Sequence, residues 1–158
     1  MKYLTTLTFA MTLIASQAAA LSCIRPDVAR TFQNVAAAEE RFVVLLGSFD
    51  FPPQRRQPVS NDAQPQQVVA KFEGQGLGAA GFVATQPKPV TLQTACAGPW
   101  CGGFPTPGQT ILAFIEQTDQ GDVLTLSACG GLVFDADTAP IVEACMRGEP
   151  CEEGPLRR

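Results

Sequence analysis

Hydrophobic positions near the two ends of the chain recur at a helical spacing. Val28, Phe32, Val35 and Ala36 fall on one face of a helix, so the pattern predicts a helix over residues 26–41 that starts near Pro26. A second helix is expected over residues 137–147. Asp137 or Thr138 could cap its start, and Gly148 stops it. Its apolar side is formed by Ile141, Val142, Cys145 and Met146.

Between these helices, apolar and alternating runs predict five strands, over residues 41–51, 67–73, 81–95, 110–117 and 122–128. The first is apolar on both faces, which fits burial on two sides or a bend around a barrel corner at Gly47. The third is interrupted around Lys88 by two prolines. Glycines from Gly74 to Gly81 are expected to form a flexible turn. Five strands with a helix at each end predict a mainly β domain, either a small barrel or a sandwich.

Two segments lack any periodicity. Residues 52–67 are polar and rich in proline, so they are expected to form an exposed, mobile loop. Residues 96–107 are dense in glycine and proline and contain the single tryptophan, Trp100, with Phe104 close by. Either these two aromatic side chains form an exposed recognition patch with the loop around them, since tryptophan is enriched at interfaces, or Trp100 plugs one end of the barrel.

The first twenty residues have the order typical of a signal peptide. Lys2 precedes an apolar stretch at residues 4–14, and small residues at 18–20 form a cleavage site. The alternative is a buried N-terminal helix. Cleavage would leave a domain at residues 21–151 and a loose tail at 152–158. No later apolar run approaches the length of a membrane span. We therefore expect a soluble protein outside the cytoplasm, either periplasmic or secreted.

Six cysteines in an exported chain predict three disulfides, although fifteen pairings are possible. Cys23 follows Leu21 and Ser22 in a loose match to a bacterial lipoprotein cleavage site, so a lipid anchor on Cys23 is the alternative. Acylation of Cys23 would leave an odd thiol, which favours the disulfide.

Composition excludes several chemistries. The chain has no histidine, which removes His-dependent nucleophilic catalysis and the usual imidazole ligands of zinc. Its formal net charge is −4 and its basic residues form only short pairs, so nucleic acid is not an expected partner. Aspartates at 119, 122, 135 and 137 do not have the spacing of a calcium loop. We expect no catalytic residues, metal or cofactor, and the candidate partner is a protein of unknown identity.

The residues also resemble a known family. Cys23 with Pro26 at the expected mature start, and Cys101-Gly102 followed by strand, turn, strand and Cys129, resemble tissue inhibitors of metalloproteinases and the related netrin-like modules, including bacterial relatives. The resemblance covers residues 22–129. It implies a five-stranded Greek-key barrel of the OB type with flanking helices. It also implies disulfides between Cys23 and Cys129, Cys96 and Cys101, and Cys145 and Cys151.

The resemblance implies a binding surface as well. In the family, the mature N-terminus and the loop after the third barrel strand lie close together, which here selects Leu21, Ser22, Trp100 and Phe104. Family inhibitors chelate a protease zinc through an N-terminal cysteine, and this chain has Leu21 at that position. We therefore expect a non-enzymatic binding module of unknown ligand. Metalloproteinase inhibition through the Leu21 amine, without the family's rigidifying disulfide, is the alternative.

Overall fold

The computed structural model describes residues 22–55 and 57–152 of the chain. The predicted signal peptide, Leu21 and nearly all of the predicted tail lie outside these residues.

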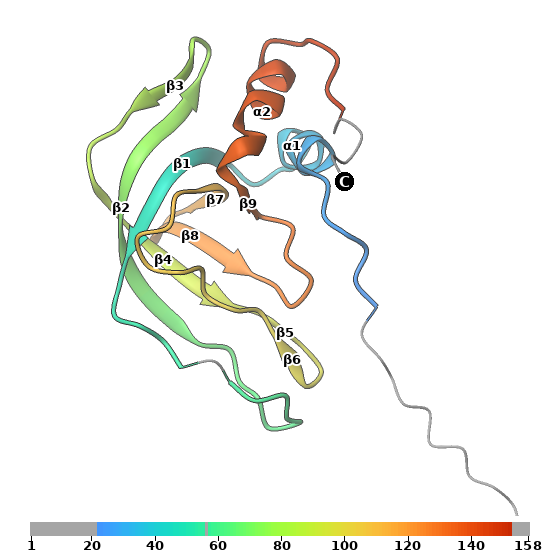
Figure 1. Ribbon diagram of the computed structural model, residues 1–158, viewed down its shortest axis with the longest axis vertical. Helices are drawn as coiled ribbons and strands as arrows, with labels where there is room; N and C mark the ends of the chain where they lie inside the picture. Colours follow the sequence, from blue (N-terminus) through green and yellow to red (C-terminus); the bar gives the residue numbers. More distant parts are fainter. Residues whose placement is uncertain (1–21, 56, 153–158) are drawn as a thin grey trace, which may run out of the picture.

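Five strands close into a barrel (Figure 1). They are β1 (Phe42–Asp50), β2 (Gln67–Gly78), β4 (Lys88–Thr94), β7 (Ile111–Thr118) and β8 (Gly121–Leu126). Their order around the barrel is β1-β2-β4-β8-β7, and pairing of β7 with β1 closes it. Neighbours are antiparallel except β4 and β8, which run parallel. The predicted five-stranded, OB-like Greek-key barrel is therefore confirmed.

Four short strands add to the barrel. β3 (Gly81–Ala84) pairs with the C-terminal end of β2, and β9 (Val133–Asp135) pairs with β7. β5 (Cys96–Ala97) and β6 (Trp100–Cys101) form a separate hairpin. The prediction of a flexible turn from Gly74 onward was wrong, because β2 continues to Gly78 and the chain reverses only between β2 and β3. The predicted interrupted strand is correspondingly two strands, β3 and β4.

Glycines allow β1 and β2 to approach closely where the barrel bends. Gly47 and Gly74 are directly opposed in the register of the two strands, and the ring of Phe72 lies beside both. A Cβ atom on either glycine would collide with the backbone of the other strand and with this ring. Phe72 is fully buried and packs against Phe49 with ring centroids 5.2 Å apart. The two glycines thus make room for the aromatic centre of the core, as expected for a barrel corner.

The two helices are shorter than their patterns predicted. α1 (Val28–Ala36) begins after Asp27, whose carboxylate accepts a hydrogen bond from the Arg30 backbone N–H at 2.8 Å. It stops well before residue 41 because residues 37–40 are exposed and gain no packing. α2 (Ala139–Met146) follows a 3₁₀ turn at Ala136–Thr138. Thr138 precedes α2 without a side-chain cap bond, and Gly148 ends this region with φ of 74°. Among the described residues, no helix is long and apolar enough to cross a membrane.

Apolar residues form two cores on opposite sides of β1 and β7. Inside the barrel, Ile111, Ala113 and Ile115 of β7 meet the other strands. On the outside, Leu112 and Phe114 meet α1 and α2, which lie side by side (Figure 1). This explains why β7 is a continuous apolar run and why β1 is apolar on both faces.

Three disulfides join the pairs that the resemblance implied: Cys23 with Cys129, Cys96 with Cys101, and Cys145 with Cys151. The bridge from Cys23 attaches the N-terminal segment to the residues that follow β8. It also uses the sulfur that a lipid anchor on Cys23 would need.

We predict that Gly74→Ala lowers the free energy of unfolding by roughly 1–3 kcal/mol, because its Cβ collides with backbone atoms that cannot move aside. Gly78→Ala in the same strand is the matched control, since its Cβ meets nothing closer than 3.9 Å. Urea denaturation of the two variants measures the difference. Equal stability of Gly74→Ala and the control would contradict the close approach of β1 and β2.

Removing the long disulfide should be the most damaging cysteine change. Cys23 and Cys129 are 106 residues apart, and the chain-entropy relation gives about 4.7 kcal/mol for a loop of about this size. The same relation gives about 2 kcal/mol for the short loop between Cys96 and Cys101. Paired serine substitutions at each bridge, compared by thermal denaturation, should follow this order. A reversed order would contradict it.

Candidate functional site

The candidate site is a cleft at one end of the barrel, of about 520 Å³. Its two walls are residues 52–55 and 57–66, from the loop that joins β1 to β2, and residues 99–107, which include β6. Figure 1 shows the loop between β1 and β2 passing the lower end of the molecule, near the β5–β6 hairpin. Ala128, just after β8, also lines it. We call this feature the barrel-end cleft.

Hydrogen bonds hold residues 57–66, the second part of the loop wall. The Gln57 side-chain amide donates to the Gln64 carbonyl at 2.6 Å, and its oxygen accepts from the Gln64 N–H at 3.2 Å. The Ser60 N–H donates to the Pro99 carbonyl of the opposite wall at 3.3 Å. At the end of the loop, the Gln66 N–H donates to the buried Thr94 hydroxyl at 2.7 Å. The segment is mostly exposed, as predicted, and these bonds connect residues 57–66 to each other and to the barrel; its mobility stays a prediction.

The opposite wall is a hairpin tied by a disulfide. Cys96 and Cys101 are opposed in the β5–β6 pair and bonded to each other, with the turn at Gly98, which has φ of 58°. After the hairpin, Gly102 lies against the Leu126 carbonyl so closely that no Cβ would fit. Its N–H donates to the Ala95 carbonyl at 3.0 Å. The hairpin is therefore held to the barrel on both sides, and Trp100 is carried on it.

Aromatic side chains form the floor of the cleft. Phe104 is partly buried, packs against the barrel core and lies 6.0 Å from Phe51, measured between ring centroids. Phe51 is itself 6% exposed. Trp100 is partly buried and lines the cleft from the hairpin. Of the two aromatics, Phe104 is the one that packs against the inner core at this end, while Trp100 contributes a wall of the cleft.

Electrostatically the cleft differs from the rest of this acidic chain. Arg55 is exposed and lines it, and none of its described lining residues is an aspartate or glutamate. Shifted pKa values are found in two exposed ion pairs outside the cleft. A hydrogen bond from Lys71 to Glu73 raises the pKa of Lys71, and a hydrogen bond from Arg147 lowers the pKa of Glu149. The cleft thus combines aromatic rings, prolines and glutamines with one guanidinium.

The structure brings together some of the residues selected from the sequence. Trp100 and Phe104 line the same cleft. Ser22 is exposed and does not line it, but Cys23 is bonded to Cys129, which directly follows the lining residue Ala128. Leu21 lies outside the described residues. Sequence reasoning missed the wall formed by residues 52–66, because its role depends on contacts with a distant segment.

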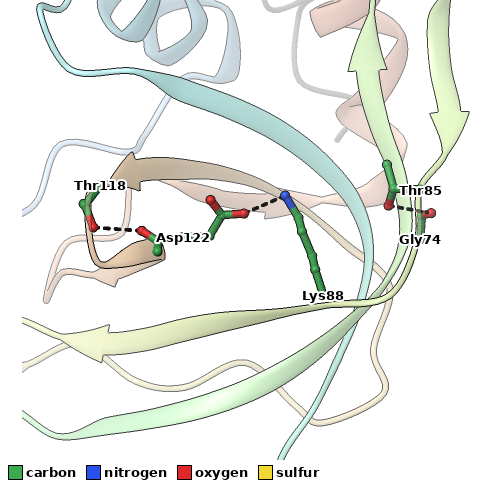
Figure 2. A network of polar contacts seen from close by, with 6 residues as sticks. Gly74, Thr85, Lys88, Thr118 and Asp122 are labelled. Carbon is green, nitrogen blue, oxygen red and sulfur yellow. Dashed lines mark hydrogen bonds and ion pairs between the residues drawn. The ribbon is translucent and has the colours of Figure 1, made fainter.

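The other end of the barrel carries a polar pair. Lys88 at the start of β4 contacts Asp122 at the start of β8, with nitrogen and oxygen 2.6 Å apart. Figure 2 shows the Lys88 side chain reaching across to Asp122, near the turn where Thr118 donates to the Gly121 carbonyl at 2.8 Å. The pair links the two parallel strands. Within residues 22–55 and 57–152, no cluster of three or more potential metal ligands is present.

Comparison with family models, with curated proteins and with solved structures finds no match to this chain. The proposed function therefore rests on the geometry of the cleft.

Proposed function

We propose that this chain is a non-enzymatic binding module that works outside the cytoplasm and holds its ligand in the barrel-end cleft. The observation that carries the proposal is the placement of Trp100 and Phe104 in a cleft whose walls are fixed by a disulfide and by hydrogen bonds. Large aromatic side chains in a preformed concave site are typical of binding surfaces. The signal-like first twenty residues and the three disulfides support a location outside the cytoplasm.

Val59 offers a test that spares the fold. It lines the cleft and its side chain is 67% exposed, whereas Val69 on β2 is 62% exposed and lies outside the cleft. We expect the unmodified chain to capture a component from cell-envelope extract or culture medium, and the Val59→Glu variant to fail to capture it. The matched control, Val69→Glu, should still capture this component, because it places the same charge outside the cleft.

The readout is affinity capture with quantitative mass spectrometry, after both variants are shown to melt like the parent chain. Trp100→Ala should lose the same component. If Val59→Glu and Trp100→Ala both still capture the component, the binding surface lies outside this cleft. Turnover of a captured small molecule by the chain would contradict a non-enzymatic role.

A second proposal concerns the mature N-terminus. The bridge from Cys23 to Cys129 holds the exposed residues 22–25 beside the end of β8, which supports a role for this segment in metalloproteinase inhibition. The zinc-binding group would be the amine and carbonyl of Leu21, which lies outside the described residues.

We expect the chain that begins at Leu21 to inhibit a zinc metalloprotease, and acetylation of its amine to abolish inhibition, because an amide nitrogen does not chelate the metal. The inhibition constant against a panel of zinc proteases measures this. Adding one residue before Leu21 should have the same effect as acetylation. Inhibition that survives both changes would rule out chelation.

A further inference from the structure

We propose that the ligand of the barrel-end cleft is an extended acidic peptide segment of a partner protein. In this arrangement an apolar peptide side chain rests on the aromatic floor, and a neighbouring carboxylate pairs with Arg55. This inference rests on the proposed binding function and adds the chemistry of the ligand.

Charge is the first argument. The chain has a formal net charge of −4, yet the described lining of the cleft carries the Arg55 guanidinium and no carboxylate. Within the described residues, Arg55 takes part in none of the ion pairs, which are Lys71–Glu73, Lys88–Asp122 and Arg147–Glu149. An exposed guanidinium at the mouth of a cleft without acids favours a ligand with a carboxylate.

Both an acidic polysaccharide and an acidic peptide could pair with Arg55, and the apolar floor of the cleft distinguishes between them. Phe51, Phe104 and Ala128 present an apolar surface, and Val59 adds to it from the rim. An acidic polysaccharide carries hydroxyl groups around each sugar, and those that face the floor would lose water against Phe51, Phe104 and Ala128 without gaining partners there. A peptide supplies an apolar side chain beside an acidic one and buries it at a gain. We therefore favour a peptide.

The walls suit an extended backbone. Pro53, Pro58, Pro99, Pro105 and Pro107 line the cleft. Proline has no N–H donor and its ring fixes the backbone, so these positions present rigid apolar rings along which an extended peptide can lie. The disulfide of the hairpin and the Gln57–Gln64 bonds hold parts of both walls, which reduces the ordering that binding requires of these parts.

The test uses the full, disulfide-bonded chain and a phage-displayed library of random peptides. We expect the selected peptides to share an acidic residue close to a large apolar one. Synthetic versions should change the fluorescence of Trp100, the single tryptophan, which reports directly from the cleft.

Charge variants at one exposed position separate charge from shape. Val59→Lys should tighten binding of the selected peptides, and Val59→Glu should weaken it, each by about two- to fivefold, the range of exposed ion pairs. Arg55→Glu should weaken it further and select basic peptides instead. Val69→Lys and Val69→Glu, outside this cleft, should leave the affinity unchanged.

Three results would overturn the inference: selected peptides without acidic residues, equal loss in both Val59 variants, or a fluorescence response to polygalacturonate with none to peptides. The proposed function fails separately. If affinity capture depends on Val59 but no acidic peptide binds, the binding function stands and the ligand class is wrong. If capture is indifferent to Val59 and Trp100, the cleft is not the binding surface and both proposals fall.

Discussion

The whole architecture depends on β1 pairing with two different strands. Its first half, Phe42 to Gly47, is hydrogen-bonded to β7, and its second half, Leu45 to Asp50, is hydrogen-bonded to β2. Gly47 lies in both registers, opposite Gly74 on one side and Ile111 on the other. A side chain at Gly47 would push β2 away, so the close approach of β1 and β2 at the barrel corner depends on the absence of side chains at this position and at Gly74. Closure removes the edges on which sheets aggregate and gives the molecule two ends.

The two ends of the barrel then have different chemistry. At one end, Lys88 and Asp122 are 30% and 16% exposed and form an ion pair between β4 and β8, where parallel pairing is short. At the other end, Phe51 and Phe104 complete the apolar interior, and the loops above them form the barrel-end cleft. The helices occupy neither end, because Val28 and Val142 pack on the outer face of β1 and β7. The cleft is therefore left open to solvent.

Local signals explain what could be predicted from the sequence. The apolar run of β7, the turn at Gly121 and the two-sided pattern of β1 depend on neighbours in the chain, and the strands they predicted are present. The resemblance to netrin-like modules supplied the disulfide partners, which spacing alone left open among fifteen pairings. The Greek-key barrel of the OB type also came from that resemblance, because periodicity left a barrel and a sandwich open.

What could not be predicted depends on distant contacts. Gly74 carries the same local signal whether it forms a turn or packs under Phe72, and only its partner Gly47 decides between them. Residues 37–40 continue the polar helical composition of α1, but nothing packs against them and the helix stops. For the candidate site, Trp100 and Phe104 stood out by composition. The opposing wall did not, because a polar, proline-rich segment gives no sign that Ser60 bonds to Pro99.

A cleft built this way is suited to recognition because cross-links within the chain hold parts of both walls. The cross-links that define it lie within the chain: the Cys96–Cys101 bridge, the Gln57 amide on Gln64, and the close approach of Gly102 to β8. Loop ordering, a large cost of association for flexible sites, is thereby reduced. The acidic surface elsewhere repels an acidic ligand, so Arg55 at the cleft gives the approach a preferred direction. Rigidity and charge therefore act at the same place.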